Sequence, residues 1–162
     1  MKKTEAPNFA LDGTIADTVK ECSGAAVGAA PGWGGDFLLT EVGYHPDRVE
    51  LNGSRFLLSN GYMGYRGTLE EAEKEDLVAC TLAGVYDQVG TAWREPVNAP
   101  NGLYTLLSFN GQPLQPGLIK PAAHQQMLDL EQALHRRRTT FTFAEHSVEI
   151  EAERFLSLPI PT

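Results

Sequence analysis

The chain has 162 residues, 42% of them hydrophobic, and a formal net charge of −8 at pH 7. This length allows one domain with a sizeable core, and the acidic balance makes nucleic acid and anionic lipid unfavourable partners. We expect neither a signal peptide nor a membrane-spanning helix, because no long apolar run is present. The two cysteines, Cys22 and Cys80, are too few for a disulfide framework, which predicts reduced thiols in a cytoplasmic protein.

Residues 1–35 are rich in glycine and alanine and poor in large apolar side chains, which predicts a flexible leader or linker. Within this segment, residues 9–18 resemble the first motif of the haloacid dehalogenase-type phosphotransferases. That family uses an aspartate nucleophile two residues before a second aspartate, whereas this chain has Ala10 in the first position and only Asp12 in the second. Because alanine cannot form an aspartyl phosphate, the stretch predicts no activity and is interpreted as a coincidence or a truncated remnant.

Short extended segments separated by turn residues make up residues 36–162, which we expect to form one domain. Apolar runs bounded by turn signals predict strands over 37–44 and 103–109, and the second of these is apolar on both faces, which predicts cover on both. The dipeptides Asn52-Gly53 and Asn110-Gly111 predict tight turns. Many short strands without a long amphipathic helix favour an all-β fold, an antiparallel β-sandwich.

Charged residues from Thr68 onward are interpreted mainly as solvated. Residues 68–76 hold four glutamates and predict a short exposed helical turn rather than a catalytic cluster, with no apolar pocket to raise a carboxyl pKa. The run Arg136-Arg137-Arg138 predicts the solvated start of a strand. Strict alternation near the end predicts a half-buried strand, in which Val148, Ile150 and Ala152 face inward and Glu149, Glu151 and Glu153 face water.

The densest motif covers residues 59–71, where three glycines recur at a spacing of three with aromatic side chains between them. Asn60-Gly61 predicts a tight reversal between two strands. The glycine spacing excludes the dinucleotide-binding fingerprint, and the lack of a following Gly-Lys-Ser/Thr excludes a phosphate-binding Walker loop. From the residues alone, the motif is interpreted as a structural hairpin.

The motif Asn-Gly-Tyr-Met-Gly-Tyr-Arg-Gly at residues 60–67, followed by Glu70-Glu71, resembles the signature of glycoside hydrolase family 65. That family holds maltose, trehalose, kojibiose and nigerose phosphorylases and some α-glucoside hydrolases. Weaker passages extend the resemblance from about Phe37 to Leu158. One departure lies after Asp129, where the family places a glycine and this chain has Gln132-Ala133, so the turn type there stays open.

The resemblance implies a supersandwich of the galactose mutarotase type, then linker helices and an (α/α)6 barrel that carries the active site. This chain would form part of the sandwich and hold no catalytic residue, no metal and no cofactor. The parent enzyme would perform inverting phosphorolysis of an α-glucosidic disaccharide bound through the missing barrel, with inorganic phosphate as co-substrate and β-glucose 1-phosphate as product. A homo-oligomer is a further expectation. The resemblance leaves open which glycosidic linkage the parent enzyme cleaves and whether it uses phosphate or water. The alternative to an enzyme part is a stand-alone carbohydrate-binding β-sandwich.

Four residues are candidates for contacting the substrate or a domain interface. Asn60 is expected to serve its turn by tolerating left-handed backbone, and Arg66 either to pin a loop through backbone carbonyls or to face the barrel. The two tryptophans, Trp33 and Trp93, are expected to pack at a domain interface or to stack on sugar rings. No metal-type spacing joins the four histidines, which are interpreted as surface or loop residues: His45, His124, His135 and His146.

Overall fold

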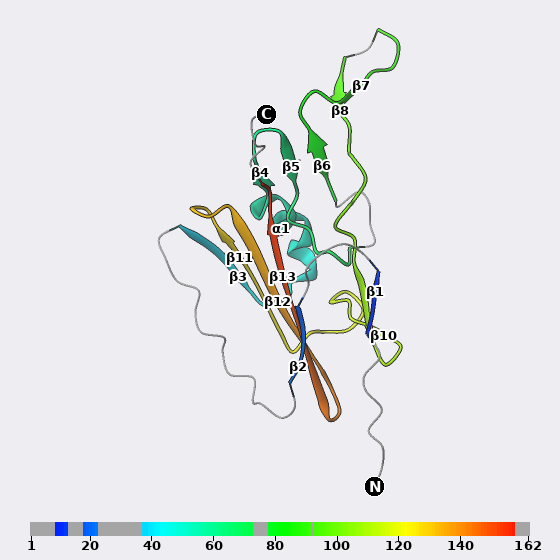
Figure 1. Ribbon diagram of the computed structural model, residues 1–162, viewed down its shortest axis with the longest axis vertical. Helices are drawn as coiled ribbons and strands as arrows, with labels where there is room; N and C mark the ends of the chain where they lie inside the picture. The colour runs from blue at the N-terminus through cyan, green and yellow to red at the C-terminus, as the bar shows by residue number, and fades with distance from the viewer. Residues whose placement is uncertain (1–8, 13–17, 23–36, 73–77, 92, 158–162) are drawn as a thin grey trace.

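The computed structural model describes residues 9–12, 18–22, 37–72, 78–91 and 93–157. Within these residues the protein is built from antiparallel strands arranged in four sheets, with one short α-helix between them (Figure 1). The expected all-β fold with antiparallel sheets is confirmed. In the part of the chain described, no helix is long and apolar enough to cross a membrane.

The largest sheet has five antiparallel strands, and its two longest strands form a hairpin of ten residues on each side. In the hairpin, Phe141 lies opposite Val148. Val148, Ile150 and Ala152 are buried, so the predicted alternation of the last strand is confirmed. The order across the sheet is β2 (Thr18–Cys22), β13 (His146–Phe155), β12 (Leu134–Phe143), β11 (Ala123–Asp129) and β3 (Leu38–Val42).

Smaller elements form a second layer against the inner face of this sheet. One three-stranded sheet contains β1 (Phe9–Asp12), β9 (Leu106–Phe109) and β10 (Gln112–Pro113). A second contains β4 (Leu58–Ser59), β5 (Met63–Tyr65) and β6 (Cys80–Leu82). Beside them lie the turn η1 (Pro46–Arg48), helix α1 (Val49–Arg55) and the two-stranded ribbon of β7 (Tyr86–Asp87) and β8 (Glu95–Pro96).

The apolar core lies between the two layers. Its largest cluster joins the second layer to the β12–β13 hairpin and contains Leu107, Phe109, Leu114, Phe141, Val148 and Ile150. A neighbouring cluster packs Phe56 and Leu58 against Leu128 of β11. Each such side chain stabilises the fold by roughly 1.5–3 kcal/mol when removed from water, so the two clusters hold the layers together.

Two local expectations are wrong. Asn52-Gly53 lies inside α1 rather than in a turn. A Cβ on Gly53 would lie 3.1 Å from the Arg66 side chain, and the Gly53 carbonyl accepts a hydrogen bond from the Gly67 amide at 2.8 Å, so the helix and the signature lie close together here. The strand near 103–109 is also not covered on both faces, since Tyr104 and Leu106 are 42% and 39% exposed.

Other turns behave as expected or settle an open point. Asn110 and Gly111 both take positive φ, 49° and 77°, which matches a hairpin turn of the predicted kind between β9 and β10. Ala133 also takes positive φ, 51°, so the turn after Asp129 uses left-handed backbone without a glycine. Two stretches of residues 1–35, for which no strand was expected, pair with the sheets as β1 and β2.

Candidate functional site

The glycine signature forms the reversal between β4 and β5, as predicted. Gly61 carries the positive φ of this turn, 82°. The Asn60 side-chain oxygen accepts hydrogen bonds from the backbone amides of Tyr62 at 3.0 Å and Met63 at 2.7 Å, while its amide nitrogen donates to the Ser157 carbonyl at 2.7 Å. Asn60 therefore shapes the turn through its side chain and not through left-handed backbone, which corrects that expectation.

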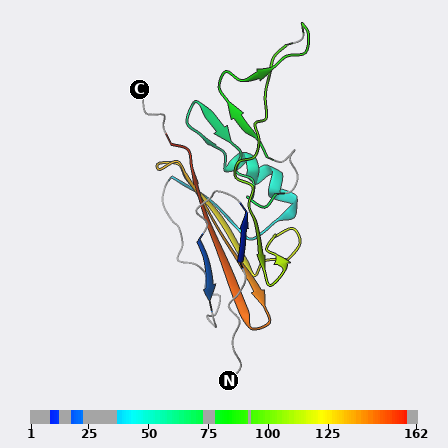
Figure 2. The same ribbon diagram turned by 45° about the vertical axis from the view of Figure 1, so that its right-hand side comes forward.

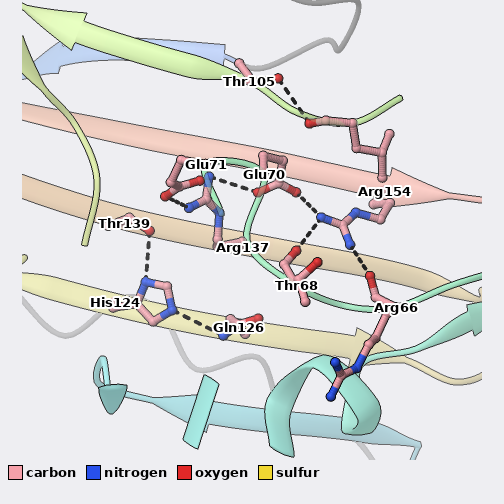
Figure 3. A network of polar contacts seen from close by, with 11 residues as sticks. Arg66, Thr68, Glu70, Glu71, Thr105, His124, Gln126, Arg137, Thr139 and Arg154 are labelled. Carbon is pink, nitrogen blue, oxygen red and sulfur yellow. Dashed lines mark hydrogen bonds and ion pairs between the residues drawn. The ribbon is translucent and has the colours of Figure 1, made fainter. Parts of the chain in front are cut away.

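The second half of the signature is held against α1. A Cβ on Gly67 would lie 2.4 Å from the Phe56 carbonyl oxygen, so only glycine permits this approach. Arg66 donates to the Glu50 carbonyl at 2.7 Å and to the Ser54 hydroxyl at 3.2 Å. Arg66 thus ties the signature to α1, and its side chain points toward the helix in Figure 3. The alternative that Arg66 faces a further domain stays a prediction.

Arg154 of β13 organises the backbone that follows the signature. Its guanidinium donates to the Arg66 carbonyl at 2.9 Å, to the Thr68 carbonyl at 2.7 Å and to Glu70 Oε1 at 2.5 Å (Figure 3). Arg154 and Glu70 are both buried. Charged groups removed from water in this way need partners for their donors and acceptors, and here one planar fork serves two carbonyls and a carboxylate.

Arg137 of β12 completes the network by bridging the two adjacent carboxylates. Its guanidinium lies 3.0 Å from Glu70 Oε2 and donates to Glu71 Oε1. Burial alone would raise the pKa of Glu70, but the charges of Arg137 and Arg154 outweigh it and lower the pKa to about 2. Burial raises the pKa of Glu71, helped by the charge of Glu70, and Arg137 offsets only part of that shift.

Two histidines lie beside this network and are neutral at pH 7. Gln126 donates to His124 Nε2 at 3.3 Å, so the proton sits on Nδ1, which donates to the Thr139 hydroxyl at 2.9 Å. His135 stacks on Phe56, with ring centroids 5.3 Å apart. Burial and nearby arginine charges lower the pKa of each histidine to about 3, and the interpretation of both as surface residues is wrong.

The network has no room for a substrate. No water molecule fits between these side chains. The volume open to water in the space lined by Glu70, Glu71 and Arg137 is about 0 Å³. Glu70 is ionised and engaged on both oxygens, so it cannot donate a proton to a glycosidic oxygen. Among the described residues, no group of three histidine, cysteine or acidic side chains is placed to hold a metal ion. The arrangement holds the signature in place.

The chain is similar to a family of known proteins over most of its length. The model of the glycosyl hydrolase family 65 N-terminal domain matches residues 39–162. The chain belongs to family 65. It is 42% identical over 123 residues to the nigerose phosphorylase of Lachnoclostridium phytofermentans, covering 76% of this chain and 16% of that protein. It is 31% identical over 131 residues to the 1,2-alpha-glucosylglycerol phosphorylase of Bacillus selenitireducens, covering 76% and 17%.

A solved structure gives the same fold for this family 65 domain. A protein from the human microbiome, provisionally named a kojibiose phosphorylase, superposes with a TM-score of 0.66 at 22% identity, over 74% of this chain and 18% of that one. At this identity the likeness concerns the fold alone. The chain thus spans about one sixth of the length of the relatives it matches and corresponds to their N-terminal domain.

The family 65 domain distributes the sequence-predicted candidates over separate places. Asn60 and Arg66 lie in the signature, Trp93 is 82% exposed in the ribbon of β7 and β8, and Trp33 lies outside the described residues. Sequence reasoning missed the buried network, whose members are Glu70, Glu71, Arg137 and Arg154. Strand alternation could have identified the two arginines as inward-facing. Arg137 lies on the same face of β12 as Phe141, and Arg154 lies on the same face of β13 as Ile150.

Proposed function

We propose that this domain is the non-catalytic N-terminal part of a cytoplasmic enzyme that cleaves an α-glucosidic disaccharide with inorganic phosphate. The observation that carries the proposal is the family match over residues 39–162, together with relatives that are named as phosphorylases and of whose length the matched part of the chain covers about one sixth. The closed carboxylate network supports the non-catalytic half, because a general acid must reach its substrate.

Inverting phosphorolysis needs a carboxylic acid on one side of the glycosidic bond and a phosphate nucleophile on the other. The product would be β-glucose 1-phosphate. In this proposal the remainder of the longer enzyme binds the disaccharide and the phosphate and supplies the acid. The domain described here contributes a rigid support, in which Asn60 shapes the signature turn and Arg154 holds the backbone at the end of the signature.

The test compares the 162-residue chain with the complete enzyme read from its gene. Each is incubated with phosphate and nigerose, kojibiose, maltose or trehalose, and glucose 1-phosphate is measured. We expect release by the complete enzyme on at least one sugar and none by the chain alone. Omitting phosphate is the control, since free glucose formed without it would indicate hydrolysis. Phosphorolysis by the 162-residue chain itself would contradict the proposal.

A stand-alone carbohydrate-binding module is a second candidate, supported by the exposed Trp93 but not favoured by the family match. Exposed aromatic rings stack on sugar faces, so binding would change tryptophan fluorescence in a saturable way. The same titration of Trp93→Phe, which keeps Trp33, is the control. No fluorescence response of the unmodified chain to a panel of glucans removes this candidate.

A further inference from the structure

One segment of the domain contributes nothing to its core. Every described residue from 83 to 96 is exposed, and these residues, 83–91 and 93–96, are called the arm. Its strands β7 and β8 have two residues each. A two-stranded ribbon this short is marginal in water unless something packs against it. Figures 1 and 2 both place the arm beyond the body of the domain, at the end opposite the β12–β13 turn.

The arm nevertheless has a defined shape and an apolar surface. Gln88 accepts a hydrogen bond from Arg94 at 3.1 Å and donates to the Gly90 carbonyl at 3.2 Å. The side chains of Trp93 and Val89 are 82% and 78% exposed, and Tyr86 is 54% exposed. Large exposed side chains grouped in this way are typical of a surface that becomes buried against a partner.

The surface of the arm continues onto the glycine signature. A shallow groove of about 230 Å³ lies between the arm and the β4–β5 turn, lined by Tyr62 and Met63 on one side and Tyr86 and Pro96 on the other. Tyr62 is 60% exposed, and its carbonyl accepts a hydrogen bond from the Ala83 amide at 2.7 Å. The signature and the arm therefore present one continuous surface.

The path of the chain indicates what covers this surface. Asn60 donates to the carbonyl of Ser157, the last described residue, so a chain that continues leaves the domain beside Tyr62 and the groove. The domain covers 16% of its nigerose phosphorylase relative, which leaves 84% of a protein of that length outside it. A following segment tethered at this point has a high effective concentration at the arm, unlike a second copy of the chain.

We propose that the arm and Tyr62 form the docking surface for the part of the longer enzyme that follows this domain, an inference that rests on the proposed function. The charges of the arm are few and of both signs, Asp87, Glu95 and Arg94, so the partner surface is mainly apolar. Trp93 is the anchor of this interface. The contact buries aromatic surface and requires no ligand.

The test measures how fast a cysteine on the arm reacts with a maleimide. Val89→Cys is the main variant, because it changes little volume, and Trp93→Cys is the second. Leu118→Cys, 66% exposed and remote from the arm, is the matched control. Each is made with Cys22→Ser in both the 162-residue chain and the complete enzyme, and the labelled peptide is identified by mass spectrometry, which separates it from buried Cys80.

We expect Val89→Cys and Leu118→Cys to react at similar rates in the 162-residue chain. In the complete enzyme, Val89→Cys should react at least about tenfold more slowly while Leu118→Cys is unchanged. Equal reactivity of Val89→Cys in both proteins overturns the proposal. Protection of the short chain that grows with its concentration, or with added disaccharide, overturns it in favour of a second copy or a sugar.

Phosphorolysis is measured on the same preparations, so the two proposals fail separately. An active enzyme with a reactive arm overturns the docking surface and leaves the proposed function standing. An inactive enzyme with a protected arm overturns the function and leaves the interface. If Trp93→Cys reacts fast in the complete enzyme while Val89→Cys stays protected, Trp93 is confirmed as the anchor, because its removal alone frees the arm.

Discussion

The two faces of the β12–β13 hairpin carry the same kinds of charge in opposite surroundings. On the inner face, Arg137 and Arg154 have side chains only 2% and 5% exposed. On the outer face, Arg136 pairs with Glu153 at 2.5 Å with side chains 34% and 49% exposed, and Arg138 makes a similar pair with Glu151. Strand alternation assigns each arginine to a face, and the face decides whether its charge is structurally indispensable or nearly neutral in energy.

The largest difference between the faces is expected when one arginine is removed from each. Arg154→Met leaves Glu70 Oε1 and two backbone carbonyls without their shared donor and should lower the free energy of unfolding by about 3–5 kcal/mol. Arg136→Met, the matched control on the outer face, should lower it by less than about 1 kcal/mol. Urea unfolding at pH 7 measures both.

Arg154→Lys separates charge from geometry in the same experiment. Lysine keeps the charge but cannot donate to two carbonyls and a carboxylate from one planar group. The decrease in the free energy of unfolding for Arg154→Lys should therefore lie between those for Arg154→Met and Arg136→Met. Equal losses for Arg154→Met and Arg136→Met would remove the distinction between the faces.

A second contrast lies within the inner face, between its two carboxylates. The folded pKa of Glu70 is lowered from 4.5 to about 2, so its ionised form stabilises the fold above pH 4.5, and this contribution is lost as pH falls toward 2. Glu70→Gln should therefore cost about 3 kcal/mol at pH 7. For Glu71 the pKa is raised, so ionisation opposes folding as pH rises, and Glu71→Gln should be close to neutral.

Unfolding in urea at pH 7 and at pH 3 checks this contrast. The stability gap between the unmodified chain and Glu70→Gln should narrow at the lower pH, whereas Glu71→Gln should show no such narrowing. A larger loss for Glu71→Gln than for Glu70→Gln would reverse the assignment of the two carboxylates.

The two buried neutral histidines should make the stability of the domain depend on pH. The folded pKa values of His124 and His135, about 3, lie below the ordinary value of 6.5. The unfolded chain therefore binds more protons as pH falls below 6.5, and each histidine should lower stability by about 1.4 kcal/mol per pH unit in that range. His135→Phe keeps an aromatic ring against Phe56. It should reduce the dependence of the unfolding free energy on pH, between pH 6.5 and pH 5, by about 1.4 kcal/mol per pH unit.

Val148→Ala is the control for that series, because it weakens the core without touching a titrating group. Its pH profile should run parallel to that of the unmodified chain at lower stability. A slope unchanged by His135→Phe would mean that His135 titrates alike in the folded and unfolded chain.

The smallest expected effect is the coupling within the outer-face pair. A double-mutant cycle on Arg136 and Glu153 should give less than about 0.5 kcal/mol and approach zero in 1 M NaCl, where screening acts over a few ångströms. The same cycle on Arg137 and Glu71, from which water is excluded, should keep its value in salt. Salt sensitivity of the inner cycle would show that solvent reaches the network.

Local sequence patterns predicted the frame of the domain well. Asn60-Gly61 and Asn110-Gly111 both form the expected reversals, because a glycine with positive φ stands between two strands at each. Asn52-Gly53 lacks flanking strands and lies in α1. The inward set of β13 followed from its alternation. The strand expected over 37–44 appears as β3, because an apolar run bounded by turn residues is a local signal.

The buried network was beyond those patterns. Glu70 and Glu71 stand in a run of charges that predicts exposure, and their burial depends on Arg137 and Arg154, which lie 66 and 84 residues further along the chain. A partner at that separation leaves no mark on the neighbouring sequence. Parity in β12 would have placed Arg137 inside, but without its carboxylates a buried arginine has no rationale.

The pairing of Arg154 with the segment after the signature also has a temporal consequence. The ribosome makes Glu70 long before Arg154, and β13 is the last strand among the described residues. Until that strand emerges, the glutamates stay hydrated and the bend at Gly67 has no clamp, so a nascent chain can collapse locally without acquiring its final register. Synthesis of residue 154 thus permits the last folding step of a motif that was synthesised nearly ninety codons earlier. The same separation along the chain sets the entropy cost of closing the loop between Arg154 and the motif.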